Sequence, residues 1–388
     1  MNDQLTKYAC IIPEPSCLEK ELEYWRDEMK KLLSNDDYQL SRISFFINTT
    51  NWEDYIEMKE ILSKETEALS DNILFDVIAQ PPAGGQTFTA ECAFFHNSIN
   101  IEHKTTTSTY YQKVTFEGHT EIHAFGLTGG EHCKTEACSL IAFKKMEEIL
   151  KAEDLEFGDV VRQWNYIEHI IEINQSSSGM FQNYQIFNDV RSNYYSTSQF
   201  TEGYPAATGI GTSSGGVIIS FIAVKPTEQV KVIPVINPRQ VDAHQYSQQV
   251  LVGEHLSNVD QRTSPKFERA KLVSGTNQAV NYISGTAAII GEDTIPVEDY
   301  KQQTIETLEN IKLLIKKKNP SIASVIGKYK KPTVGYLRVY INKPEHFQEV
   351  KTVCEELHPD VAYNYVIGDV CRDNLLVEIE GVYHYKVK

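Results

Sequence analysis

Two long stretches of the chain show the same order of hydrophobic and polar patterns. The first, residues 113–226, begins with strand-like KVTFEG and EIHAFGLTGG, followed by apolar residues at helical spacing in KTEACSLIAFKKMEEILKAE. A strand-like VVRQWNYI, a short helical YQIFNDVRSNYY and the apolar run GGVIISFIAV complete it. The pattern predicts the order β-β-α-β-α-β-β, and its recurrence indicates a protein built from similar units.

The second stretch, residues 271–388, repeats this order. Strand-like AVNYISGTAAIIG precedes the amphipathic VEDYKQQTIETLENIKLLIKKK, whose final lysines suit the C-terminal end of a helix dipole. The strand GYLRVYI, the helix HFQEVKTVCEEL and the strands AYNYVIGDVCR and LLVEIEGV follow. Gly126 and Gly285 fall at matching places on the second strand of each unit.

The rest of the chain divides into three parts. Residues 43–112 predict part of a third unit without the opening strands and first helix, and residues 1–42 predict an N-terminal extension with a helical segment. Residues 227–270 form a polar connection with little periodicity, which is typical of an active-site loop, with a surface insertion as the alternative. We therefore expect an α/β (α+β) fold of tandem units.

The charge and composition of the chain argue against several classes of partner and site. The 53 acidic residues exceed the 37 Lys and Arg residues, giving a net charge of −16, which argues against nucleic acid or an anionic membrane as the main partner. The seven cysteines lack the spacing of a zinc site, so we expect no metal. We also expect no organic cofactor. The N-terminal MNDQLTKYAC does not resemble a signal peptide, and no run reaches the roughly 18 apolar residues of a membrane span. These features favour a cytoplasmic protein.

The final strand carries two acidic residues on one face. Side chains alternate in LLVEIEGV, so Glu378 and Glu380 point the same way. Solvated glutamates on an exposed face are one interpretation. A buried Glu378 would instead have a raised pKa and could donate a proton at neutral pH.

Several strings resemble known proteins. The Gly-containing second strand, KQQTIETLENI and VEIEG resemble the RidA (YjgF-like) fold, in which units pack around a shared barrel-like core with pockets between neighbours. The strings VVRQWNYI, YQIFNDVR, YPAATGIG, NPRQV, ISGTAAIIG and DVCRDNLLVEIEG, in this order, resemble the chorismatases, which are fused RidA-like units. The resemblance covers about residues 43–388. The first 40 residues and a longer loop from Tyr246 to Ser264 depart from the family pattern.

The resemblance implies roles for three residues. Glu378, the first Glu of VEIEG, would protonate the enolpyruvyl ether of chorismate and so release pyruvate. Gly285 and Cys371 occupy the positions that steer product choice, Gly285 by leaving room beside the ring and Cys371 as a weak donor. This combination resembles the branch that forms 3-hydroxybenzoate. For Cys371 the alternative is an inert buried cysteine.

Chorismate carries two carboxylates, which guanidinium groups suit because their donors form a planar fork. The expected substrate-binding residues are Arg191, Tyr194, Arg239, Tyr246 and Arg372. Arg162 is a further candidate, with a solvent-facing position as its alternative. A plain surface charge is the alternative for each of these arginines.

Three other functions stay open at this point. The chain could hydrolyse chorismate to a dihydroxycyclohexadiene carboxylate, deaminate enamines or imines as RidA proteins do, or bind an aromatic acid without catalysis. We expect a monomer or a small homo-oligomer.

Overall fold

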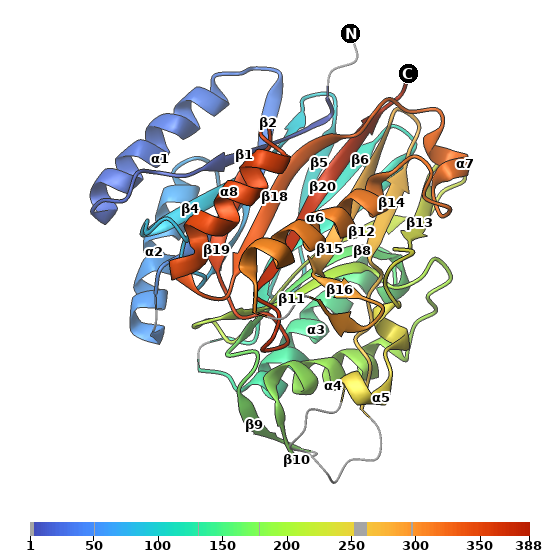
Figure 1. The fold of residues 1–388 in the computed structure, drawn as a ribbon. Helices are drawn as coiled ribbons and strands as arrows, with labels where there is room; N and C mark the ends of the chain where they lie inside the picture. The colour runs from blue at the N-terminus through green and yellow to red at the C-terminus, as the bar shows by residue number, and fades with distance from the viewer. Residues whose placement is uncertain (1–3, 50, 131, 178, 252–261, 296–297) are drawn as a thin grey trace.

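In the described part of the chain, three large β-sheets carry helices on their outer faces, and two two-stranded hairpins, β9-β10 and β16-β17, accompany them (Figure 1). The structure is a computed structural model, and it describes residues 4–388 apart from 50, 131, 178, 252–261 and 296–297. Most of the loop from Tyr246 to Ser264 therefore lies outside the described residues. Within the described part of the chain, no helix is long and apolar enough to span a membrane.

The first sheet has the strand order β1-β4-β2-β3. Trp25 and Met29 of α1 are buried in the same apolar cluster as Phe45 of β2, so α1 covers this sheet. Residues 1–42, which the sequence analysis separated as an extension, thus supply a strand, a helix and part of β2. The elements are β1 Thr6–Ile11, α1 Leu18–Leu33, β2 Tyr38–Ile47, α2 Trp52–Glu67, β3 Leu74–Ile78 and β4 Phe88–His96.

The second sheet has the order β11-β8-β12-β7-β6-β5, so it begins before the expected boundary at residue 113. Helices α3 and α4 cover it, and a two-stranded hairpin, β9-β10, projects below α4 in Figure 1. The elements are β5 Asn100–Thr105, β6 Tyr110–Phe116, β7 His119–Thr128, α3 Thr135–Ala152, β8 Val160–Glu168, β9 Ile173–Ser176, β10 Gly179–Gln182, α4 Asn183–Tyr195, β11 Ala206–Thr212 and β12 Val217–Lys225.

The third sheet, β13-β14-β15-β20-β18-β19, repeats the topology of the second. Its first strand lies inside the stretch 227–270 that the sequence analysis described as a connection. Helices α6 and α8 cover it. The elements are β13 Lys231–Val235, α5 Gln248–Leu251, β14 Ala270–Ser274, β15 Gln278–Ala287, β16 Ile289–Ile290, β17 Asp293–Thr294, α6 Tyr300–Ile315, α7 Ala323–Ile326, β18 Thr333–Ile341, α8 Phe347–Leu357, β19 Tyr363–Ile367 and β20 Val377–Lys386.

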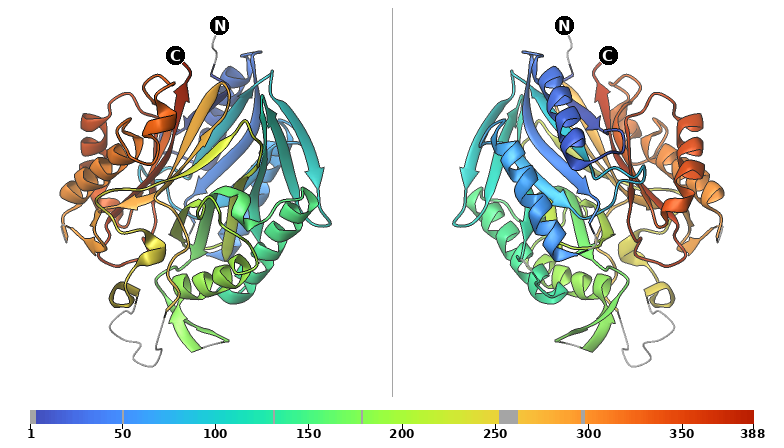
Figure 2. Two further views of the ribbon diagram at one scale, coloured as in Figure 1. Left: turned by 90° about the vertical axis from the view of Figure 1, so that its right-hand side faces the viewer. Right: turned by 90° about the vertical axis from the view of Figure 1, so that its left-hand side faces the viewer.

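The inner faces of the three sheets meet in a shared core (Figure 2). Phe46 of β2, Trp164 of β8 and Tyr340 of β18 belong to one buried cluster there. The predicted α/β fold of repeated units is confirmed. Among the described residues, however, the strands pair as separate sheets and do not close into one barrel.

Matching bulges interrupt the second and third sheets. The β7-β12 register shifts beside Gly126, and the β15-β20 register shifts between Ile283 and Thr286, around Gly285. The predicted correspondence of the two glycines is therefore confirmed. Bulges bend a strand and re-aim its side chains, and the bulge at Gly285 borders the pocket described next.

Candidate active site

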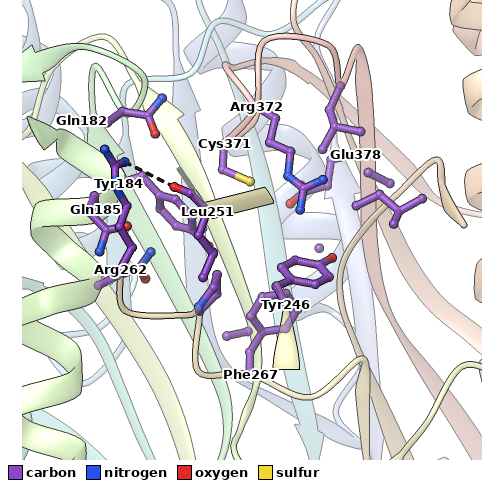
Figure 3. A pocket seen from close by; sticks show the side chains of 18 of the residues that line it. Gln182, Tyr184, Gln185, Tyr246, Leu251, Arg262, Phe267, Cys371, Arg372 and Glu378 are labelled. Atoms are coloured by element: carbon purple, nitrogen blue, oxygen red, sulfur yellow. Dashed lines mark hydrogen bonds between the residues drawn. The ribbon is translucent and has the colours of Figure 1, made fainter. Parts of the chain in front are cut away.

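A pocket opens at the seam between the second and third sheets (Figure 3). One wall comes from α4, which contributes Tyr184 and Gln185, and from the edge strand β11 beside it. The opposite wall carries Cys371, Arg372 and Glu378. The pocket thus joins parts of the chain that are almost 200 residues apart in sequence.

Glu378 lies on β20, paired with Ala287 of β15 on one side and with Tyr340 of β18 on the other. The residue is only 6% exposed. Burial, reinforced by the charge of Glu380, raises its pKa from 4.5 to about 8, against the opposing effect of Arg162 and Arg269. The carboxyl group is therefore mostly protonated at neutral pH.

Glu380, two residues further along the same face, is held in a different state. Burial alone would favour its neutral form, but Arg162 and Arg338 outweigh burial and keep its pKa below the ordinary value. Arg338 Nη1 donates to Glu380 Oε1 at 2.6 Å, and Trp164 Nε1 donates to the same oxygen at 2.9 Å. Arg162, a candidate for binding substrate, instead forms a buried ion pair with Glu380.

Arg338 extends this ion-pair network to the first sheet. Its Nη2 lies 2.5 Å from Glu91 Oε2, and Glu91 belongs to β4. With Arg162 on β8 and Glu380 on β20, all three sheets contribute to one buried group of two acids and two arginines. Paired charges of this kind are costly to break, so the network fixes β20 in the core.

Gly285 lies directly against the Glu378 carboxyl group. A Cβ atom placed on Gly285 would overlap Oε1 of Glu378 and lie 3.2 Å from Cγ2 of Thr208. A side chain at this position would therefore force the Glu378 carboxyl group, the end of a flexible side chain, to move. The absence of a side chain at Gly285 thus leaves space that the carboxyl group occupies in this structure.

Cys371 lines the same wall as Glu378. Burial, with a contribution from the nearby Glu378, raises the pKa of its thiol to about 12. The thiol is therefore neutral at physiological pH, which excludes a standing thiolate nucleophile and leaves a weak hydrogen-bond donor.

Three arginines line the pocket: Arg262, Arg269 and Arg372. Arg269 Nη2 donates to the hydroxyl group of Tyr246 at 2.8 Å, and the Arg372 guanidinium lies 4.9 Å from the centre of the Tyr246 ring. Arg262 donates to the carbonyl of Leu251 at 3.3 Å, whereas its buried Nε and Nη2 have no partner among the described residues. These donors make the pocket locally cationic in an acidic protein.

Arg191, the first candidate from the sequence, lies just behind this wall. It is 2% exposed, and its Nη2 donates to Oδ1 of Asn188 at 2.5 Å, while Asn188 itself lines the pocket. The buried Nε of Arg191 has no hydrogen-bond partner among the described residues. A buried cation with an unpaired donor is costly, so an anion in the adjoining pocket would offset its charge.

The structure separates two other candidates from the pocket. Arg239 forms an ion pair with Glu306 at 2.5 Å on the outer side of the third sheet's helix α6. Tyr194 donates to the carbonyl of Leu140 at 3.1 Å and stacks on Phe143 between α3 and α4. Among the expected substrate-binding residues, Tyr246 and Arg372 line the pocket directly.

Sequence reasoning did not single out Arg262, Arg269, Tyr184 or Asn188. Arg262 and Arg269 belong to the polar stretch 227–270. Hydrophobic and polar residues show no regular spacing there, so the sequence does not predict which side chains point into the molecule. The helical spacing of Tyr184, Asn188 and Arg191 is a signal that could have identified that face of α4, because residues four and three apart share one side of a helix.

The chain is similar to proteins described as chorismatases. Residues 98–223 match a family model described as chorismatase FkbO/Hyg5-like, N-terminal. A 3-hydroxybenzoate synthase of Streptomyces hygroscopicus is 31% identical over 248 residues, which span 62% of this chain and 67% of that protein. A chorismatase of Streptomyces rapamycinicus is 29% identical over 231 residues, spanning 59% of this chain and 65% of that protein.

The fold is also similar to a solved structure. A chorismatase crystal structure at 1.08 Å resolution superposes with a TM-score of 0.68, at 19% sequence identity, over 97% of this chain and 98% of that chain. The superposition therefore extends on both sides beyond residues 98–223, the part that matches the family model.

Proposed function

The chain belongs to the chorismatase family, and we propose that it cleaves chorismate to pyruvate and 3-hydroxybenzoate. One observation carries the proposal: the buried carboxyl group of Glu378 lines a pocket together with three arginines, and burial raises its pKa to about 8. The name of the Streptomyces hygroscopicus relative supports the choice of product.

The charges of the pocket suit a dianion. Arg262, Arg269 and Arg372 offer guanidinium donors to the pocket, and the buried charge of Arg191 adds to the local positive potential. Planar guanidinium groups bind carboxylates through paired hydrogen bonds. In this proposal the arginines hold the ring and side-chain carboxylates, so that the enolpyruvyl group lies beside Glu378.

Glu378 acts as a general acid on the enol ether. It transfers its proton to the terminal methylene carbon, which becomes a methyl group, and positive charge develops on the ether-bearing carbon as in an oxocarbenium ion. The carboxylate left on Glu378 stabilises this cation. General acid catalysis of this kind contributes about 10²–10⁴-fold to the rate.

The second half of the reaction determines the product. The 4-hydroxyl group of the ring attacks the cationic carbon and loses its proton. The bond between this oxygen and ring carbon 4 then breaks, and ring carbon 3 loses its hydrogen as the ring becomes aromatic; one of the protons released restores the Glu378 acid. The remaining hemiketal breaks its bond between the side-chain carbon and the 3-oxygen, so the side chain leaves as pyruvate with the former 4-oxygen and the ring keeps the 3-oxygen as a phenol. Chorismate therefore gives 3-hydroxybenzoate and pyruvate without net water, and the neutral Cys371 is placed to donate to an oxygen of the substrate.

Incubating the purified protein with chorismate tests the proposal. Coupled detection of pyruvate together with chromatography of the aromatic products should show both products in equal amounts. Pyruvate with a dihydroxycyclohexadiene carboxylate would assign the hydrolytic branch instead. Binding of chorismate without pyruvate release would indicate a binding protein, and ammonia release from imino acids would indicate a deaminase.

A further inference from the structure

A single hydroxyl group joins the second and third sheets beside the pocket. Thr208 lies on β11 between Ala207 and Gly209, which line the pocket, whereas Thr208 itself does not. Its Oγ1 accepts a hydrogen bond from the Gly285 amide at 3.0 Å and another from Arg162 Nη2 at 2.8 Å. It donates its own proton to the Glu380 carboxylate. One donor and two acceptor positions are all that a hydroxyl group has, so this one is fully used.

Neighbouring contacts make this seam rigid. The Ala207 amide donates to Ser284 Oγ at 3.0 Å, one residue before Gly285. On the other side of β11, Asn165 Nδ2 donates to the Thr208 carbonyl at 3.0 Å. The bulge of β15 is thus fastened to β11 by two adjacent hydrogen bonds, and β11 is itself anchored to β8.

The position of this bulge decides where the general acid can lie. Gly285 and Glu378 are in such close contact that a Cβ on Gly285 would overlap the carboxyl group. Any shift of the Gly285 backbone therefore moves the wall on which that carboxyl group rests. The Gly285 amide is the group that Thr208 holds.

We propose that Thr208 is a positioning residue for the reaction: its hydroxyl group binds the Gly285 amide and the Glu380 carboxylate together and so sets the place of the Glu378 carboxyl group. This inference rests on the proposed role of Glu378 as the acid. Thr208 does not touch the substrate, so its loss should affect the chemical step more than binding.

The variant Thr208→Val tests this, because it keeps the shape of the side chain and removes the hydroxyl group. The Gly285 amide then loses its partner, and the bulge can relax. Since a misplacement of about 1 Å can cost roughly 10²-fold in rate, we expect kcat for pyruvate release to fall by about 10- to 100-fold. KM for chorismate should change by less than about threefold, because the pocket arginines are untouched.

Two matched variants separate positioning from a general loss of stability. Thr208→Ser keeps the hydroxyl group and should retain kcat within about threefold of the wild type. Thr66→Val removes a hydroxyl that is equally buried but bonds only to the Leu62 carbonyl of its own helix, at 2.8 Å. Its kcat should match the wild type even where its melting temperature falls as far as that of Thr208→Val.

Crystal structures of the wild type and Thr208→Val provide a readout that needs no substrate. We expect the Gly285 backbone and the Glu378 carboxyl group to move by about 0.5 Å or more, the tolerance of a working site. Thr208→Ala replaces the valine variant if the latter does not fold. Equal kcat values for Thr208→Val and Thr66→Val, no recovery in Thr208→Ser, or unmoved Gly285 and Glu378 would overturn the inference. Absence of pyruvate release by the wild type would instead refute the proposed function, while the crystal structures still decide the role of Thr208.

Discussion

Glu378 and Glu380 lie two residues apart on the same face of β20, and their surroundings move their pKa values in opposite directions. Glu380 is ionised because two arginines surround it, and its negative charge adds to the burial that keeps Glu378 protonated. Two neighbouring acids with separated pKa values are a recurring way to assign a proton donor in an enzyme.

The pH dependence of the reaction should follow the titration of Glu378. Because only the protonated form donates, kcat/KM should be constant below about pH 8 and fall by about tenfold per pH unit above it. Initial rates of pyruvate release from pH 6 to pH 10 would show this decrease at alkaline pH, the alkaline limb of the profile. If the same alkaline limb is found in a Glu378→Gln variant with residual activity, it reports the titration of a different group.

The same pKa shift affects stability. The pKa of Glu378 is raised in the folded state, so its neutral form stabilises the fold fully below pH 4.5, and this contribution is lost as the pH rises towards 8. Glu378→Gln removes the effect and should become more stable relative to the wild type across this window, by on the order of a few kcal/mol. Urea unfolding of both proteins at pH 5 and pH 8 measures the difference, and an equal difference at the two pH values would contradict it.

Removing the charge of Glu380 should lower the pKa of Glu378. In Glu380→Gln the arginines Arg162 and Arg269 remain, so their charge favours ionisation of Glu378, and the decrease of kcat/KM at alkaline pH should begin at a lower pH. The variant should also lose about 3–5 kcal/mol of stability, since breaking a buried ion pair leaves charges without partners. The pH profile, measured at a temperature where the variant is folded, checks the first point. A limb that stays at the wild-type pH would argue against electrostatic coupling.

Part of this site could be predicted from the sequence because local patterns determine it. Alternation along VEIEG places Glu378 and Glu380 on one face, and the repeat places Gly126 and Gly285 at matching bulges. Neither pattern states which face is buried. The raised pKa of Glu378 depends on burial and on the ionised Glu380, which is in turn held by Arg162 from another sheet, a residue that the sequence could equally place in solvent.

Replacing Gly285 should disturb the acid and, with it, the product. The added Cβ of Gly285→Ala would overlap the Glu378 carboxyl group, so that group must rotate or β15 must shift. We expect kcat to fall by roughly 10- to 100-fold and the share of 3-hydroxybenzoate among the products to fall. Chromatography of the products would detect both effects. An unaltered rate and product profile would contradict the proposed contact.

The arginines of the pocket should govern binding. Arg262→Gln removes buried donors that have no partner among the described residues, and a lost hydrogen bond to a charged group costs about 1.5–3 kcal/mol, so KM should rise by roughly 10- to 100-fold. Arg239→Gln is the matched control, because Arg239 pairs with Glu306 outside the pocket. Steady-state kinetics with chorismate would compare them. Equal effects on KM would mean that the pocket does not hold the substrate carboxylates.

The sequence alone does not predict which arginines reach the pocket. Arg191 and Arg239 both follow from motif strings, yet one lies behind the pocket wall and the other on an outer ion pair. Arg262 and Arg269 reach the pocket from a segment without periodicity, whose path depends on how the second and third sheets meet. Such contacts between segments far apart in sequence depend on how the sheets pack, and the pattern of neighbouring residues does not predict them. For the same reason β1 and α1 could not be recognised as parts of the first sheet.

The central claim is that Glu378 donates the proton that starts chorismate cleavage, and Glu378→Gln tests it most directly. Glutamine has nearly the same shape but no acidic proton. Pyruvate release should therefore fall by about 10²–10⁴-fold, while calorimetry should show chorismate binding with an affinity close to that of the wild type. A folded Glu378→Gln variant that releases pyruvate at the wild-type rate would contradict the account.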